Sequence, residues 1–99
     1  MLAHGKGVQA LRATTKTNLG IVLNYEKAEP AFDTAESRAA AAVWHALYNE
    51  WYVGGAVKGA YPKLMTDALA AYLPKGWEDE MDTVAQPMDF LGVNYYTRA

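Results

Sequence analysis

The chain has 99 residues, with nine basic and eleven acidic side chains and a formal net charge of −2. This length suits one small domain or one part of a larger domain. The near-neutral charge argues against nucleic-acid binding, and the absence of cysteine excludes a disulfide framework and any thiolate metal site. Apolar runs such as Ala39–Trp44 are too short to cross a bilayer, and no leader with a basic start and an apolar stretch is visible. These features predict a soluble, cytoplasmic protein.

The first two segments indicate a helix followed by a strand. Residues 1–12 place apolar side chains at helical spacing, and residues 14–18 form a polar connection. The run Leu19–Asn24 is almost entirely apolar and contains β-branched residues. Such a run predicts a strand covered on both faces, as in a parallel sheet.

A long helix is predicted from Thr34 to Tyr52. Asp33 and Glu36 have the spacing of a capping box, so Asp33 is the expected N-cap, and Gly54–Gly55 is the expected end. Its apolar and aromatic face comprises Val43, Trp44, Leu47, Tyr48, Trp51 and Tyr52. The polar positions elsewhere on the wheel are Glu36, Arg38, His45, Asn49 and Glu50.

The last third of the chain predicts a helix, a helical turn and a second strand. Pro62 suits the first turn of a helix that residues 74–76 end, and residues 81–85 form a short helical turn. The run Asp89–Tyr96 predicts the strand. The buried side of the helix is expected to comprise Leu64, Met65, Leu69, Tyr72 and Leu73.

This order of elements describes a βαβ unit of the α/β class. Strands joined through helices pair in parallel, with a right-handed crossover. Two strands alone leave both edges of the sheet unpaired. The sequence therefore predicts one incomplete segment over residues 1–99 rather than a complete domain.

Polar side chains gather at the carboxyl end of each predicted strand. Period-two alternation places Asn94 and Tyr96 on one face of the second strand, and Asn24 closes the first strand. In a (β/α)₈ barrel, active sites are built at these ends of the strands. The alternative is that these residues simply end their strands as turn-formers.

The run Asp89–Arg98, Asp-Phe-Leu-Gly-Val-Asn-Tyr-Tyr-Thr-Arg, resembles the sixth-strand signature of family 1 glycoside hydrolases, the β-glucosidases. The rest of the chain is similar to the same family in order, including Leu19–Asn24 as the fifth strand. The resemblance covers essentially all residues and implies a partial (β/α)₈ TIM barrel, with two parallel strands and a multi-helix crossover. Further matching segments are 2–5, 8–12, 29–31, 58–62, 73–74 and 86–90.

The resemblance implies a parent enzyme that hydrolyses β-glucosides with retention, using two glutamates and no metal or organic cofactor. In the family these lie in an Asn-Glu-Pro motif upstream and a Glu-Asn-Gly motif downstream, and neither tripeptide occurs here. Glu29–Pro30 follows Ala28 and the wrong strand, so it is rejected as the acid. The segment alone is expected to be inactive and to need the remaining barrel segments. The alternative is a non-catalytic fragment or complementation module.

The resemblance also assigns supporting roles to three residues. Tyr96 matches the tyrosine whose hydroxyl donates a hydrogen bond to the nucleophilic glutamate, which keeps that carboxylate ionised and aligned. Asn94 matches the asparagine near the acid/base side of the substrate site. Asn24 lies where family members present a polar residue toward the leaving group.

Other conspicuous residues receive structural interpretations. His4 and His45 lie on helices expected outside a barrel, and residues 78–82 lack the spacing of a cation-binding loop. The aromatic stripe of the long helix has helical spacing and is assigned to core packing rather than to sugar binding. Glu50 stands where the family commonly has a basic residue, which puts a surface ion pair there in doubt.

Overall fold

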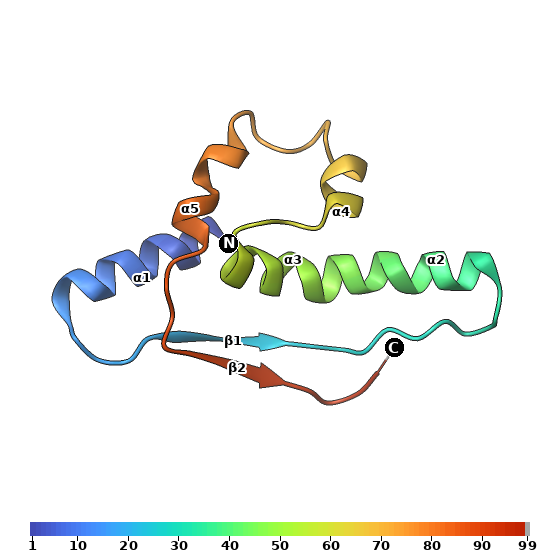
Figure 1. Ribbon diagram of the computed structural model, residues 1–99, viewed down its shortest axis with the longest axis horizontal. Helices are drawn as coiled ribbons and strands as arrows, with labels where there is room; N and C mark the ends of the chain where they lie inside the picture. The colour runs from blue at the N-terminus through green and yellow to red at the C-terminus, as the bar shows by residue number, and fades with distance from the viewer. Residues whose placement is uncertain (99) are drawn as a thin grey trace.

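The computed structural model describes residues 1–98, in which a pair of parallel strands runs beneath a layer of helices (Figure 1). The molecule is a slab of 51 × 34 × 16 Å. Its elements in chain order are α1 (Leu2–Thr14), β1 (Gly20–Asn24), α2 (Ala35–Trp44), the π-helical η1 (His45–Glu50), α3 (Trp51–Val53), the π-helical η2 (Gly54–Lys58), α4 (Lys63–Ala68), the 3₁₀ turn η3 (Trp77–Glu80), α5 (Met81–Val84) and β2 (Phe90–Asn94).

The two strands pair in parallel, as the sequence predicts, and in a register that aligns their carboxyl ends. Gly20 lies opposite Phe90, and Asn24 lies opposite Asn94. Each strand glycine lies opposite a larger residue, Gly20 opposite Phe90 and Gly92 opposite Val22, and a Cβ on Gly20 would lie 2.6 Å from the Phe90 ring. Because aligned residues of parallel strands share a face, both asparagines lie on one face of the sheet.

The helices cover one face of this sheet. Ile21 and Leu23 are partly covered, whereas Val22, on the opposite face, is 56% exposed. Figure 1 shows every described helix on the same side of the two strands. The expectation that β1 is covered on both faces is therefore wrong for the part of the chain described here.

The open face is the one that carries Asn24 and Asn94, because these residues share the alternation of Val22.

The strands begin at a polar junction with α1. Asp89 accepts a hydrogen bond from the Leu19 N–H at 2.8 Å and returns one from its own N–H to the Leu19 carbonyl at 2.7 Å. Arg12 donates to the Asp89 carboxylate at 3.2 Å and to the Pro87 carbonyl at 2.7 Å. The pKa of Asp89 is lowered chiefly by the Leu19 N–H and further by Arg12, against a partial desolvation.

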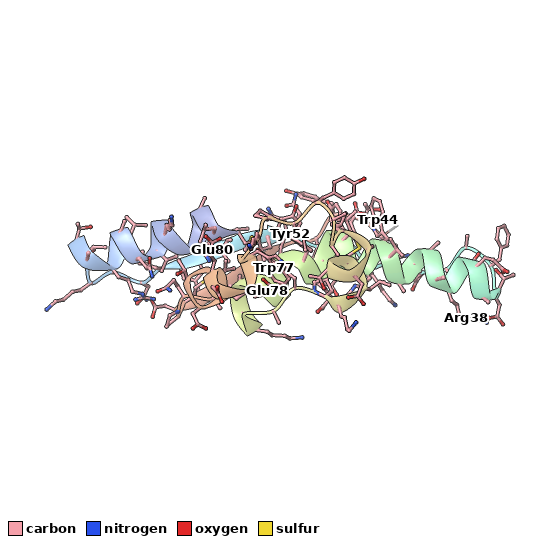
Figure 2. The ribbon with its side chains drawn as sticks, turned by 90° about the horizontal axis from the view of Figure 1, so that it is seen from above. Arg38, Trp44, Tyr52, Trp77, Glu78 and Glu80 are labelled. Atoms are coloured by element: carbon pink, nitrogen blue, oxygen red, sulfur yellow. The ribbon has the colours of Figure 1, made fainter. Side chains whose placement is uncertain are left out.

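The helical path that begins with α2 is longer than the sequence predicts, and Thr34, not Asp33, caps it. The Thr34 hydroxyl accepts from the Ser37 N–H at 3.2 Å, while Asp33 forms an ion pair with Arg38. Asp33 and Thr34 are adjacent, and both side chains can serve as an N-cap. Asp33 pairs with Arg38, and Thr34 provides the cap. Figure 2 shows Arg38 at the N-terminal end of this helix.

Gly54 and Gly55 do not end the helix, which continues through η2 to Lys58. Both glycines are buried, and a Cβ on Gly54 would lie 2.7 Å from the Ala60 carbonyl oxygen. The two glycines allow the helix to pack closely against residues 60–61 and do not form a turn. The helix ends one step later at Gly59, whose φ of 67° lies in the left-handed region that glycine tolerates.

The buried core lies between α1, the middle of the long helix and the α4–α5 segment. Gly5 lets α1 approach α5 closely, since a Cβ there would lie 2.6 Å from the Thr83 carbonyl carbon. Tyr61 stacks on Trp51 with ring centroids 4.0 Å apart. The buried apolar residues are Val8, Ala46, Ala56, Met65, Met81 and Val84.

The helix expected between Pro62 and residue 73 is shorter in the structure. It ends at Ala68, and the chain then forms turns in which the Leu73 N–H bonds to the Leu69 carbonyl at 3.2 Å. Leu73 precedes a proline, which disfavours helical backbone there. Of the expected buried side, Met65 alone is buried, and Tyr72 is 84% exposed.

Candidate functional site

The structure brings Asn24 and Asn94 together at the carboxyl ends of the strands. The Asn94 carboxamide Nδ2 donates to Asn24 Oδ1 at 3.1 Å, and the Asn94 carbonyl accepts from the Tyr25 N–H at 2.9 Å. Tyr96 follows two residues later and is 85% exposed. It makes no hydrogen bond with the other residues described, so its hydroxyl is presented to the surroundings.

The asparagine pair retains hydrogen-bonding capacity of both kinds. A carboxamide has two N–H donors and one carbonyl oxygen with two lone pairs. The mutual bond uses one donor of Asn94 and one lone pair of Asn24. The remaining donors and acceptors lie on the exposed face of the sheet, where they suit hydroxyl groups, which both donate and accept.

Asn49, which sequence reasoning placed on the polar side of the helix, is instead fully buried, with 0% exposure. Its Oδ1 accepts from the Glu26 N–H at 3.1 Å, and its Nδ2 donates to the Glu26 carbonyl at 2.6 Å. The helical wheel missed this residue because its partner is the main chain of Glu26, in the connection after β1. The signals in the sequence are its polarity within the predicted helix and its place, with Trp51, in the segment that resembles the fifth crossover of the family.

His45 supports Asn49 from the same turn of η1. Its Nδ1 lies 3.0 Å from Asn49 Nδ2, and its ring meets Tyr25 edge-on at a centroid distance of 6.2 Å. Because Asn49 Nδ2 is a donor, Nδ1 of His45 acts as the acceptor and the ring proton lies on Nε2. That nitrogen lies 3.5 Å from Glu50.

Glu50 forms ion-pair contacts despite the sequence-based doubt. It lies 3.5 Å from His45 Nε2 and 3.7 Å from Lys58 Nζ. Glu50 therefore has an imidazole nitrogen on its N-terminal side and the Lys58 ammonium group on its C-terminal side. These contacts join η1 to η2 across α3.

A second polar cluster extends the strand pair beyond the two asparagines. Lys27 and Arg98 form a parallel bridge, and both pair with Glu29, at 2.9 and 3.2 Å. The pKa of Glu29 is lowered first by the hydrogen bond from Lys27 and then by Arg98. A carboxyl group held ionised in this way is unsuited to act as a general acid, in keeping with its rejection above.

The remaining candidates from the sequence do not form a site. His4 has a buried Nε2 without a partner among the described residues, and burial lowers its pKa. Within residues 1–98 no three histidine, aspartate or glutamate side chains converge as metal ligands would. None of the helices described there combines the length and apolar character needed to cross a membrane.

The aromatic stripe of the long helix is not a closed core in this part of the chain. Trp44 and Tyr48 stack with centroids 5.4 Å apart, but Trp44 and Tyr52 are close to half exposed. Figure 2 shows Trp44 and Tyr52 along the same edge of the helix. With Asn24, Tyr48 and Tyr52 line an open cavity of about 340 Å³ beside β1.

Solved structures with the same arrangement of strands and helices are β-glucosidases with a TIM-barrel fold. A family 1 β-glucosidase from Thermotoga maritima superposes with a TM-score of 0.84 at 33% identity, covering 95% of this chain and 21% of that one. The virulence factor SghA, solved with its substrate analog salicin, superposes with a TM-score of 0.89 at 34% identity, covering 98% and 22%. The fold predicted from the sequence, a partial (β/α)₈ barrel, is confirmed.

A 1,4-beta-D-glucan glucohydrolase from Thermotoga neapolitana is 37% identical over 97 residues, which are 96% of this chain and 23% of that protein. The model of glycosyl hydrolase family 1 matches residues 1–99. The chain belongs to glycosyl hydrolase family 1. It spans about a fifth of the length of the relatives that it matches.

Proposed function

We propose that this chain is one segment of a retaining β-glucosidase that hydrolyses the O-glycosyl bonds of β-glucosides. The observation that carries the proposal is the Asn24–Asn94 pair, bonded at the carboxyl ends of two parallel strands in a chain related to β-glucosidases. Active sites of (β/α)₈ barrels lie at those ends. The partners of the segment are then the remaining parts of the barrel and a β-glucoside substrate.

The reaction needs two carboxyl groups that this segment does not supply. One glutamate attacks the anomeric carbon and forms a covalent glycosyl-enzyme, while the other protonates the leaving oxygen and then activates water. Both belong to other segments in this proposal, so the 99-residue chain alone is inactive. If the chain instead acts as a non-catalytic module, its association with other segments will not be required for its role.

The three polar residues of the segment assist those glutamates and the substrate. Tyr96 donates its hydroxyl hydrogen to the nucleophile, and its 85% exposure supports this role because the group is open to a partner from another segment. Asn94 contacts the sugar on the acid/base side. Asn24 contacts the leaving group, and the bond between the two asparagines keeps both carboxamides in a fixed orientation.

The proposal is tested by Tyr96→Phe in the intact enzyme, with Tyr95→Phe as the matched control. Removal of one preorganised donor lowers kcat by about 10²- to 10³-fold. Tyr95 precedes it, lies on the opposite face of the extended chain and is also exposed, so its variant should retain the wild-type rate. Equal rates for the two variants would exclude the role given to Tyr96.

A further inference from the structure

We propose that Asn49 is a positioning residue that fixes the main chain after β1 and thereby places Asn24 against the leaving group. This inference rests on the proposed function. Asn49 lies in the helix layer and not on the open face of the sheet, so it acts through the Glu26 main chain that it binds.

Asn49 binds the Glu26 main chain at both of its polar groups. The carboxamide oxygen receives the Glu26 N–H at 3.1 Å, and the carboxamide nitrogen reaches the Glu26 carbonyl at 2.6 Å. This two-point contact imitates the bonding of a neighbouring strand. Because Asn49 is 0% exposed, an apolar side chain that fills the same space would leave the Glu26 N–H and carbonyl without these partners.

The orientation of the Asn49 carboxamide is also fixed. Its oxygen has to face the Glu26 N–H, which turns its nitrogen toward the Glu26 carbonyl and toward Nδ1 of His45, 3.0 Å away. An aspartate at this position would keep the shape and the acceptor but would set a carboxylate oxygen against the Glu26 carbonyl. The site therefore discriminates between two side chains of nearly equal size.

The Asn49–Glu26 contact affects Asn24 because Glu26 follows Asn24 by only two residues. The Tyr25 N–H bonds to the Asn94 carbonyl on one side, and Glu26 bonds to Asn49 on the other. The strand end is thus held from both edges. Without Asn49, the described contacts left near Asn24 are the pairing with β2, the side-chain bond from Asn94, the edge-on contact of Tyr25 with His45 and the Lys27–Arg98 bridge, and none of these binds the Glu26 main chain.

The test compares Asn49→Leu and Asn49→Asp in the intact enzyme, with Gln86→Leu as a matched control. Gln86 also donates an amide hydrogen to a main-chain carbonyl, that of Asp82 at 3.0 Å, but lies at the opposite end of the strands. Cellobiose reports the first chemical step, in which the leaving group is present. Saturating 2,4-dinitrophenyl β-glucoside, with its very good leaving group, reports the second step, in which the leaving group has departed.

We expect kcat/KM for cellobiose to fall by about 10- to 100-fold in both Asn49 variants, because small misplacements of contacting groups cost this much. The kcat for the dinitrophenyl substrate should stay within about twofold of wild type, and Gln86→Leu should change neither. Equal losses in both steps would mean that Asn49 only supports the fold, and unchanged kinetics would mean that it positions nothing. Either result overturns the inference.

Asn49→Asp keeps the test decisive if Asn49→Leu does not fold, because it preserves volume and one hydrogen bond. Failure of the wild-type enzyme to cleave both substrates would refute the proposed function itself, and this outcome is distinct from a failure of the variants to separate the two steps.

Discussion

Replacing Gly5 by alanine should lower the stability of the protein, because α1 and α5 touch through this glycine. An added Cβ would lie 2.6 Å from the Thr83 carbonyl carbon and 3.0 Å from Val84 Cα, and nearer still to the Thr83 carbonyl oxygen. These are main-chain atoms, so no side-chain rotation relieves the contact. The helices have to move apart, at a cost of about 1–3 kcal/mol for an overpacked core.

Gly7 provides the control within the same helix. A Cβ on Gly7 would meet no atom within 4 Å. Alanine is favoured over glycine in a helix by about 0.5–1 kcal/mol, so Gly7→Ala should stabilise the protein by that amount. Both substitutions gain the same helical preference, and the difference between them therefore isolates the steric cost at Gly5.

The assay is equilibrium unfolding in urea of the two variants in the intact protein, with circular dichroism as the signal. Gly5→Ala should unfold at a lower urea concentration than wild type, and Gly7→Ala at a higher one. The two free energies of unfolding should differ by about 1–3 kcal/mol. If Gly5→Ala is as stable as Gly7→Ala, the close crossing of α1 and α5 is wrong.

Two further predictions concern the strand pair. Asp89 has a pKa below its ordinary value in the folded protein, so its contribution to stability is present above that ordinary value and is lost as pH falls through the lowered one. The urea midpoint of Asp89→Asn should therefore fall less than that of wild type between neutral and acidic pH, and parallel curves would contradict the role of the Leu19 N–H. Gly92→Ala should destabilise by no more than about 1 kcal/mol, because its Cβ would lie 2.8 Å from Val22 Cγ2, a side-chain atom on the exposed face that rotation can move. Adding Val22→Ala should restore part of this loss, whereas strictly additive thermal shifts would count against the contact.

The strands and their pairing could be predicted because they depend on local pattern and on connection length. The predicted runs Leu19–Asn24 and Asp89–Tyr96 each contain the observed strand, and helices between two strands favour parallel pairing. The meeting of Asn24 and Asn94 follows from this, since parallel strands align their carboxyl ends. The assignments of Asn24, Asn94 and Tyr96 to substrate and nucleophile stay predictions.

The errors lie where tertiary contacts override local signals. Two adjacent glycines favour a helix end in isolation, but Gly54 and Gly55 are needed for close packing against the chain that follows. Two of the aromatic side chains that dominate the helical wheel, Trp44 and Tyr52, are close to half exposed, and Asn49 and Ala46 are buried instead. Asn49 could not be found from periodicity, because its partner is a main-chain group 23 residues earlier.

The long helix makes two contacts that are described above: Asn49 in η1 binds the Glu26 main chain, and Trp51 in α3 stacks on Tyr61. The π-helical geometry of η1 sets where Asn49 lies relative to Trp51. Its Trp51 N–H reaches back five residues to the Ala46 carbonyl, so this stretch holds one residue more than an α-helical turn over a similar span. Loss of one residue there would return the stretch to α-helical geometry while α2 and α3 kept their own faces. We expect the stacking of Trp51 on Tyr61 to remain and the hydrogen bonds between Asn49 and the Glu26 main chain to be lost. If Asn49 positions Asn24 as proposed, a change in length at this turn would alter the leaving-group end of the site and leave the rest of the long helix in place.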